Sequence, residues 1–111
     1  MNQFVPLRDQ LVQVTEQIRA AREHLWDAVN DKIKFKELLK ARETYLINEG
    51  LIKASNAEAR EALLRSETAP ERADLLAAES AERSRTLDLE CLLDKRRCQE
   101  NILKIEELGE D

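Results

Sequence analysis

Apolar side chains recur at alternating intervals of four and three residues along the first half of the chain. This spacing keeps one stripe of a helix facing a partner helix, as in a coiled coil. No glycine or proline interrupts residues 7–48, and Pro6 stands at the start, where a helix tolerates proline. The pattern predicts a helix over residues 7–48. Its seam would comprise Leu7, Leu11, Val14, Ile18, Ala21, Leu25, Ala28, Lys32, Phe35, Leu39, Arg42 and Leu46.

A second set of apolar residues flanks this seam and widens the apolar face beyond what one partner helix covers. The set indicates that a further element, besides one partner helix, packs against this face. Its members are Val12, Trp26, Val29, Ile33, Leu38 and Tyr45.

The last part of the chain shows the same spacing and predicts a helix over residues 69–108. Thr68 and Glu71 have the spacing of a capping box, Pro70 lies in the first turn, and Gly109 would close the helix. The predicted seam is Ala73, Ala77, Ser80, Ser84, Leu87, Cys91, Asp94, Cys98, Ile102 and Ile105. Leucines extend this seam, and four of them, Leu89, Leu92, Leu93 and Leu103, form the stripe through which we expect dimerisation.

Between the two long helices, turn and capping residues predict a short third one. Gly50 is suited to the left-handed conformation just past a helix end. Ser55 and Asn56 are both good N-caps, so a short helix is expected over residues 57–65.

Two long helices with a short connection should fold back as an antiparallel, coiled-coil-like hairpin, a single domain over residues 1–111. Folding about the connector pairs positions that sum to about 117, which brings the row Lys32, Lys36 and Lys40 near Glu79 and Glu82. Such a hairpin leaves much apolar surface in water, and the chain has 17 leucines. We therefore expect a homodimer with a four-helix arrangement.

The composition agrees with an all-α fold. Charged residues make up 37% of the chain and aromatic residues 4%, with two glycines and two prolines. The net charge of −5 argues against a nucleic-acid partner. No apolar run reaches the length of a membrane span and no signal peptide precedes the first helix, so a cytoplasmic protein without membrane contact is expected.

Residues with catalytic or metal-binding chemistry are few. His24 is the single histidine, and the two glycines lie too far apart for a phosphate-binding loop. Glu79 and Glu82 could start a Mg²⁺ site of an all-α nucleotide hydrolase, but the second acidic pair that such a site needs is missing. We expect no enzyme activity, no cofactor and no metal.

Cys91 and Cys98 lie seven residues apart on one helix face. That distance is too long for a disulfide between them. They are expected to be half-buried core residues, with a disulfide between two chains as the alternative.

A row of basic residues occupies the end of the first long helix. Lys32, Lys36, Lys40 and Arg42 would either pair with the acidic side of the hairpin or form a face that binds anions or nucleic acid. The second interpretation would make the protein a nucleic-acid or anion-binding regulator.

The connector carries a recognisable pattern, in which an aromatic residue (Tyr45), Gly50 and an N-x-x-x-R element (Asn56 to Arg60) join two charged helices. It resembles small all-helical phage and prophage proteins of unknown function. This chain has Ala54 where that pattern often has a second glycine. Structurally, Arg60 could clasp the end of the first helix, whereas Leu51, Ile52 and Arg60 could form a knob for a protein partner. The sequence thus predicts a non-enzymatic, self-associating accessory protein.

Overall fold

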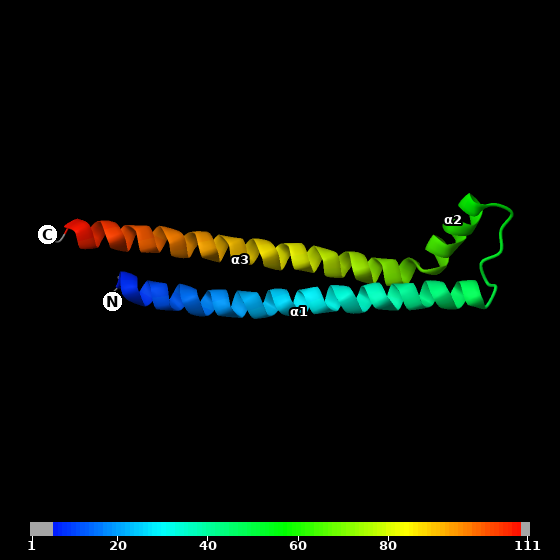
Figure 1. Cartoon of the computed structure of the whole chain (residues 1–111), viewed down its shortest axis with the longest axis horizontal. Helices are drawn as coiled ribbons and strands as arrows, with labels where there is room; N and C mark the ends of the chain where they lie inside the picture. The colour runs from blue at the N-terminus through cyan, green and yellow to red at the C-terminus, as the bar shows by residue number, and fades with distance from the viewer. Residues whose placement is uncertain (1–5, 110–111) are drawn as a thin grey trace. The chain divides into compact units, whose positions relative to one another are not determined.

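The computed structural model describes residues 6–109, which form three helices and no strand. Helix α1 spans Leu7–Asn48, α2 spans Ala57–Glu67 and α3 spans Ala69–Gly109. Helices α1 and α3 pack against each other as an antiparallel hairpin, and α2 lies in the connection between them (Figure 1). The predicted all-α hairpin is confirmed. The bounds of α1 are those predicted, and α2 ends two residues later than expected.

The chain divides into two compact units. The terminal unit consists of Met1–Trp26 and Arg83–Asp111, and the connector unit consists of Asp27–Glu82. Within each unit a segment of α1 lies against a segment of α3, so each has its own interhelical contacts. None of the helices in residues 6–109 has an apolar stretch long enough to cross a lipid bilayer.

The ends of α1 follow from local hydrogen bonding. The carbonyl of Pro6 accepts the first helical hydrogen bond, from the N–H of Gln10 at 3.0 Å. At the other end Gly50 has a φ of 67°, which L-residues with a side chain rarely adopt. The N–H of Leu51 donates to the carbonyl of Leu46, and the N–H of Gly50 donates to that of Ile47. These two bonds are the Schellman motif, and the predicted role of Gly50 is confirmed.

Helix α2 is capped by Asn56. Its side-chain Oδ1 accepts a hydrogen bond of 2.8 Å from the N–H of Ala59, and its backbone is extended. Of the two candidate caps, Ser55 and Asn56, the chain therefore uses the second. The predicted N-cap at Asn56 is confirmed.

The seam predicted for α1 is confirmed residue by residue, because every member is buried or half-buried. In the terminal unit Val14, Ile18 and Ala21 are buried. In the connector unit the buried members are Ala28, Leu39 and Leu46. The seam lysine and arginine, Lys32 and Arg42, are half-buried, as expected for long side chains that lie along a seam and reach water with their charges.

The seam predicted for α3 is wrong. Every residue assigned to it, from Ala73 to Ile105, is exposed. The inward face instead follows a series offset by about two residues, which on a helix is the opposite side. Its members are buried or half-buried: Thr68, Glu71, Arg72, Leu75, Ala78, Glu79, Glu82, Thr86, Leu89, Leu92, Leu93, Arg96, Gln99 and Leu103.

The physical reason for this offset is that α3 has polar residues on its inward face and finds partners for them on α1. Lys32 Nζ lies 2.6 Å from Glu82 Oε2. Gln99 Nε2 donates to Gln10 Oε1 at 3.5 Å. The ion pair compensates charges that would otherwise be costly to bury, whereas the Gln99 amide is satisfied only at Nε2, because its Oε1 is buried without a hydrogen-bond partner within residues 6–109.

Candidate functional site

The basic row on α1 is divided between the hairpin interior and the surface. Lys32 pairs with Glu82, and Arg42 Nε lies 3.8 Å from Glu71 Oε1. Lys36 and Lys40 are exposed. Two of the four cations thus hold α3 against α1, as the structural interpretation of the row predicts.

The predicted clasp at the connector is only partly assembled. Leu51 is exposed, Ile52 is half-buried, and Gly50 and Asn56 act as helix caps. The Arg60 side chain is exposed and makes no hydrogen bond or ion pair with any residue in the range 6–109. The connector therefore offers Leu51 and Arg60 to solvent, and Arg60 does not clasp the end of α1.

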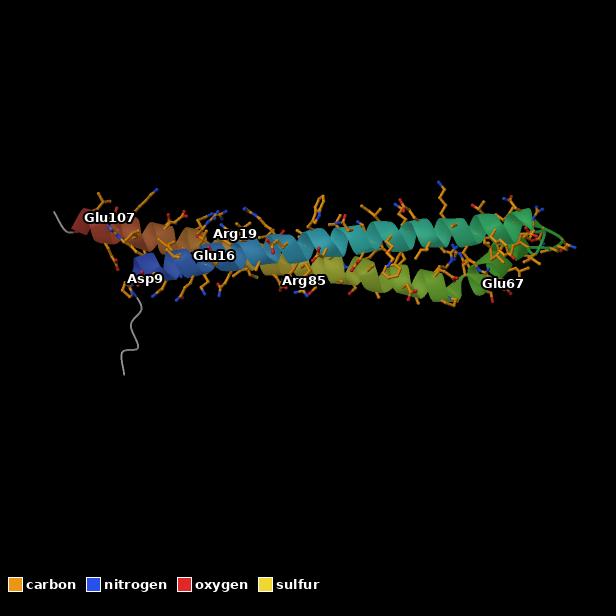
Figure 2. The ribbon with its side chains drawn as sticks, turned by 90° about the horizontal axis from the view of Figure 1, so that it is seen from below. Asp9, Glu16, Arg19, Glu67, Arg85 and Glu107 are labelled. Carbon is orange, nitrogen blue, oxygen red and sulfur yellow. The ribbon has the colours of Figure 1, made fainter. Side chains whose placement is uncertain are left out.

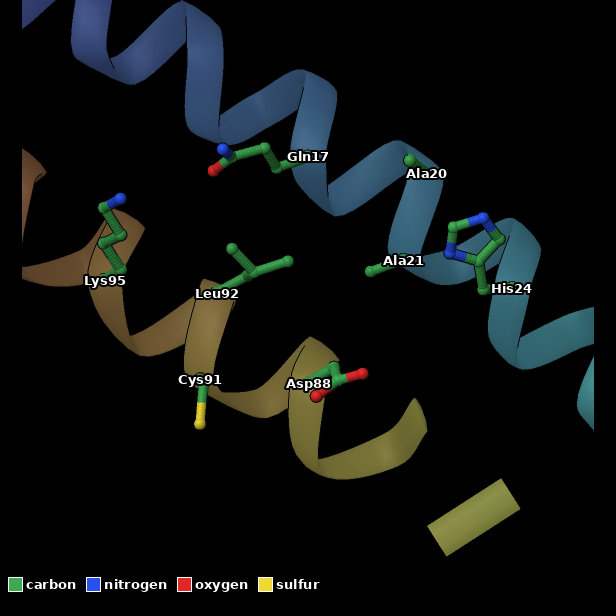
Figure 3. A pocket seen from close by; sticks show the side chains of 8 residues that line it. All are labelled: Gln17, Ala20, Ala21, His24, Asp88, Cys91, Leu92 and Lys95. Carbon is green, nitrogen blue, oxygen red and sulfur yellow. The ribbon is translucent and has the colours of Figure 1, made fainter. Parts of the chain in front are cut away.

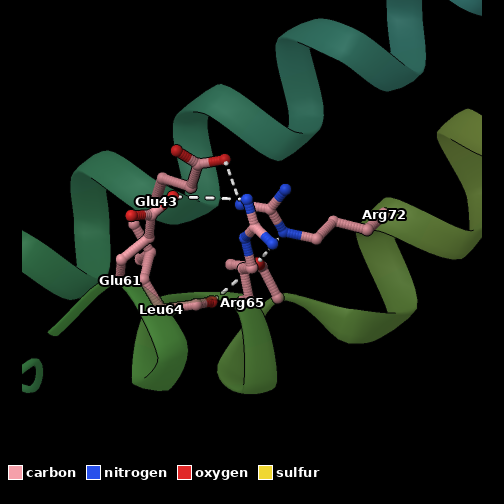
Figure 4. Close-up of polar contacts among 6 residues, drawn as sticks. Glu43, Glu61, Leu64, Arg65 and Arg72 are labelled. Carbon is pink, nitrogen blue, oxygen red and sulfur yellow. Dashed lines mark hydrogen bonds and ion pairs between the residues drawn. The ribbon is translucent and has the colours of Figure 1, made fainter. Parts of the chain in front are cut away.

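A different arginine joins the helices in the connector unit. The hydroxyl of Thr68, which is fully buried, donates to the carbonyl of Leu64 at 2.7 Å and accepts from Arg72 Nε at 2.9 Å. Arg72 also reaches across to α1, where its guanidinium lies 3.4 Å from Glu43 Oε1 (Figure 4). This Thr68 junction ties α1, α2 and α3 together. The capping box predicted for Thr68 and Glu71 is wrong, because the Thr68 hydroxyl bonds to Leu64 and Arg72 and the Glu71 carboxylate lies near Arg42.

An open groove of about 540 Å³ lies between α1 and α3 in the terminal unit. Figure 3 shows His24 and Gln17 on the α1 side and Asp88 and Lys95 on the α3 side. No hydrogen bond or ion pair joins these four side chains to one another. His24 is exposed, in agreement with its predicted surface position.

The candidate acidic pair is used structurally. Glu82 forms the ion pair with Lys32, and Glu79 is half-buried on the same inward face of α3. Within residues 6–109 no three His, Cys, Asp or Glu side chains cluster in a way that could hold a metal ion.

Both cysteines are free thiols and both are exposed, so the expectation that they are core residues is wrong. They lie on the outward face of α3, which the sequence pattern had assigned to the hairpin seam. In Figure 3 the Cys91 thiol points away from α1.

The four leucines of the predicted dimer stripe, Leu89, Leu92, Leu93 and Leu103, are half-buried on the inward face of α3. The other helix segment of the terminal unit belongs to α1, so their contacts lie within the chain. Part of each of these side chains is therefore covered within the chain, and part remains exposed.

The outward faces of both long helices carry exposed apolar side chains. Leu87 is 60% exposed and Ile105 69% exposed. Both helices also carry charged side chains at the surface, among them Glu16 and Arg19 of α1 and Arg85 of α3 (Figure 2). The other exposed large apolar residues are Val12, Trp26, Ile33, Leu38, Tyr45, Ile47, Leu51, Leu76, Ile102 and Leu108.

No family model matches this chain, and no curated protein or solved structure matches it either.

Proposed function

We propose that this protein is a non-enzymatic interaction protein whose helical hairpin associates with a second copy of itself into a four-helix assembly. The observation that carries the proposal is the amount of surface that the single chain leaves uncovered. Its accessible surface is 8671 Å². A folded monomer of the same mass exposes about 6,300 Å² by the usual scaling of area with mass.

The excess is large compared with what a stable interface uses. A standard protein–protein interface covers about 800 Å² on each partner. Covering that much of the apolar outward surface would stabilise an assembly at about 25 cal/mol per Å², before the cost of association. Two helices also bury less than the four helices of a common bundle, which shields all of its apolar faces.

The small core of the single chain also favours self-association. Among residues 6–109 the buried apolar side chains larger than alanine are Val14, Ile18, Leu39 and Leu46. A folded chain must offset about 1–2 kcal/mol of backbone entropy per residue, and a core of this size contributes little toward that. Association would add the missing burial.

The resemblance of the connector to small helical phage and prophage proteins is compatible with such an accessory role. The exposed connector residues Leu51 and Arg60 leave room for a further protein partner at the connector unit.

Sedimentation equilibrium tests the proposal. We expect a mass of about 26 kDa, twice that of the 12.8 kDa chain, from low micromolar concentration upward. We also expect the midpoint of thermal unfolding to rise with protein concentration, because association stabilises the folded state by mass action. A helical monomer of 12.8 kDa with a melting midpoint independent of concentration would contradict self-association.

A further inference from the structure

We propose that the outward face of α3 in the terminal unit packs against the same face of a second copy, with the two α3 helices antiparallel and centred on each other at the level of residues 92 and 93. This inference depends on the proposed self-association and specifies its surface, orientation and register. The partner is a second copy because the charges along the borders of this face are opposite in sign to those they would meet on an identical chain.

The face has the spacing of a coiled-coil seam. Its residues alternate at intervals of three and four, and all of them are exposed. It lies on the side of α3 opposite the half-buried series that packs on α1. Its members are Ser84, Leu87, Cys91, Asp94, Cys98, Asn101, Ile105 and Leu108, with Ile102 at one edge.

Opposite charges seven residues apart border this seam on each side. One border carries Asp88 and Lys95, and the other carries Glu90 and Arg97; all four side chains are exposed. In an antiparallel pair related by a two-fold axis, each border meets the same border of the second copy. With the centre at residues 92 and 93, Asp88 faces Lys95 of the second copy, and Glu90 faces its Arg97. Each of these attractive contacts then occurs twice.

Neighbouring registers lose this complementarity. A shift of one heptad in one direction puts Asp88 against Asp88 of the second copy and Glu90 against its Glu90. The opposite shift puts Lys95 against Lys95 and Arg97 against Arg97. Like charges at such positions oppose association. In the favoured register only Arg83 and Lys104 meet as like charges, at the outer ends, where long side chains can turn toward water.

A parallel pair is less favourable because of Asp94. In parallel register the Asp94 carboxylates of the two copies would face each other inside the seam, and burying like charges together is costly. The antiparallel arrangement places Asp94 beside Cys91 of the second copy instead. The Asp94 carboxylate also keeps its ion pair with Arg97, 3.4 Å away on its own helix.

A charge exchange tests the orientation. Asp88→Lys alone and Lys95→Asp alone should each weaken dimerisation about tenfold, because two attractive contacts become repulsive. The double variant Asp88→Lys with Lys95→Asp restores both contacts in an antiparallel pair, so its dissociation constant should return toward the wild-type value. In a parallel pair position 88 would face Arg83 of the second copy and position 95 would face its Glu90. Each exchanged side chain would then meet a like charge, and the double variant would stay weak.

The measurement is sedimentation equilibrium at low ionic strength, where exposed charges are least screened. Glu23→Lys, an exposed charge reversal in the α1 segment of the same unit, is the matched control and should leave the dissociation constant unchanged. Circular dichroism checks that helix content is kept. If the wild-type protein dimerises but the single variants keep its dissociation constant, the inference is overturned while self-association stands. The same holds if the double variant dimerises as weakly as the single ones.

Cross-linking tests the register independently. One variant, Cys91→Ser, keeps only Cys98; the other, Leu87→Cys with Cys91→Ser and Cys98→Ser, has a single thiol at position 87. The proposed register places position 87 opposite Cys98 of the second copy. Oxidation by air with copper phenanthroline should link a mixture of the two variants into heterodimers, identified by mass, and link each variant alone poorly.

Efficient cross-linking of each variant with itself would indicate a parallel pair, and would contradict the proposal. Absence of any cross-link in a mixture that sediments as a dimer would place the interface on another face. Wild-type protein that sediments as a monomer would refute both this inference and the proposed function, so the two failures are distinguishable.

Discussion

The two units of the hairpin are held together by different kinds of interaction. In the connector unit, interhelical ion pairs and a buried hydroxyl join the helices, with Lys32 Nζ 2.6 Å from Glu82 Oε2 and Thr68 fully buried. In the terminal unit an apolar seam around Ile18 joins them, and its interhelical ion pair, between Arg8 and Glu107, is exposed and 3.7 Å long. Both units also bury apolar residues, such as Ile18 in the terminal unit and Leu46 in the connector unit, so the two units differ in their interhelical polar contacts and not in having a core.

The outward faces differ as well. The outward side of α3 in the terminal unit carries Leu87, Cys91, Cys98 and Ile105 in seam spacing. In the connector unit the corresponding residues of α3 are smaller, with Ala73, Ala77 and Ser80 exposed. The outward face of α3 is thus more apolar in the terminal unit, whereas in the connector unit most of the exposed large apolar residues lie on α1, among them Ile33, Leu38 and Ile47.

Truncation of buried aliphatic side chains should have the largest effect on stability in either unit. Ile18 and Leu46 are each 2% exposed, in the terminal and connector units respectively. We expect Ile18→Ala and Leu46→Ala to lower the free energy of unfolding by about 2–5 kcal/mol each. Urea unfolding followed by circular dichroism measures this. Ile33→Ala, at an exposed position, is the control, and an equally large loss there would show that the burial pattern is wrong.

Removal of the buried hydroxyl at the Thr68 junction should have the next largest effect, confined to the connector unit. Thr68→Val keeps the shape of the side chain but leaves Arg72 Nε without its acceptor. We expect a loss of about 1–3 kcal/mol, the usual cost of an unsatisfied buried group. Thr15→Val is the control, because its exposed hydroxyl makes the same type of bond, to Leu11, at 2.8 Å. Equal effects of the two substitutions would argue against the junction.

Loss of the N-cap of α2 should cost somewhat less. Asn56→Ala removes the acceptor for the Ala59 N–H, and helix caps contribute about 1 kcal/mol. Asn56→Asp should retain most of the stability because its carboxylate accepts the same bond. Hydrogen exchange should show the loss of protection in α2 and leave the terminal unit unchanged. Unchanged protection of α2 in Asn56→Ala would contradict the role of the cap.

The smallest expected effect is that of the interhelical ion pair. Lys32→Gln should lower the free energy of unfolding by up to about 1 kcal/mol, and the loss should diminish with added salt. Lys36→Gln, on the exposed part of the basic row, should have no measurable effect. Urea unfolding of both variants at low and high ionic strength measures these effects. A larger effect of Lys36→Gln would indicate that the exposed lysines, and not the pair with Glu82, stabilise the hairpin.

The sequence was sufficient to predict the buried face of α1 because the seam of this helix is almost entirely apolar. The seam from Leu7 to Leu46 is buried or half-buried throughout, and even Lys32 and Arg42 occupy the predicted places. Pro6 and Gly50 located the ends of α1 because local backbone chemistry decides them, whereas Gly109, which was expected to close the last helix, is itself part of α3. Gly50 and Asn56 act as predicted for the same reason.

The sequence was not sufficient to predict the buried face of α3 because two series of residues on this helix have the spacing of a seam. The outward series contains Leu87, Ile102 and Ile105, and the inward one contains Thr68, Glu71 and Glu82. The regular spacing favours the outward series, although the inward one holds more large apolar residues, namely Leu75, Leu89, Leu92, Leu93 and Leu103. The choice depends on cross-helix partners such as Lys32 for Glu82, and such partners are known only after the register is known.

The candidate clasp failed for a related reason. Arg60 and Arg72 are both one turn past a helix cap, at Asn56 and Thr68. Only Arg72 lies where the Glu43 carboxylate of α1 can accept a hydrogen bond from its guanidinium. Sequence spacing alone does not distinguish the two arginines, because the acceptor comes from a distant part of the chain.

The most direct test of the central claim, that the chain self-associates through the outward face of α3, uses its two native thiols. Cys91 and Cys98 are exposed in the single chain and would be covered in the proposed assembly. Their rates of reaction with an excess of a maleimide reagent should be high in dilute protein and fall together as concentration rises through the range in which the mass doubles. Thiol reactivity that stays constant while the mass doubles would contradict the claim.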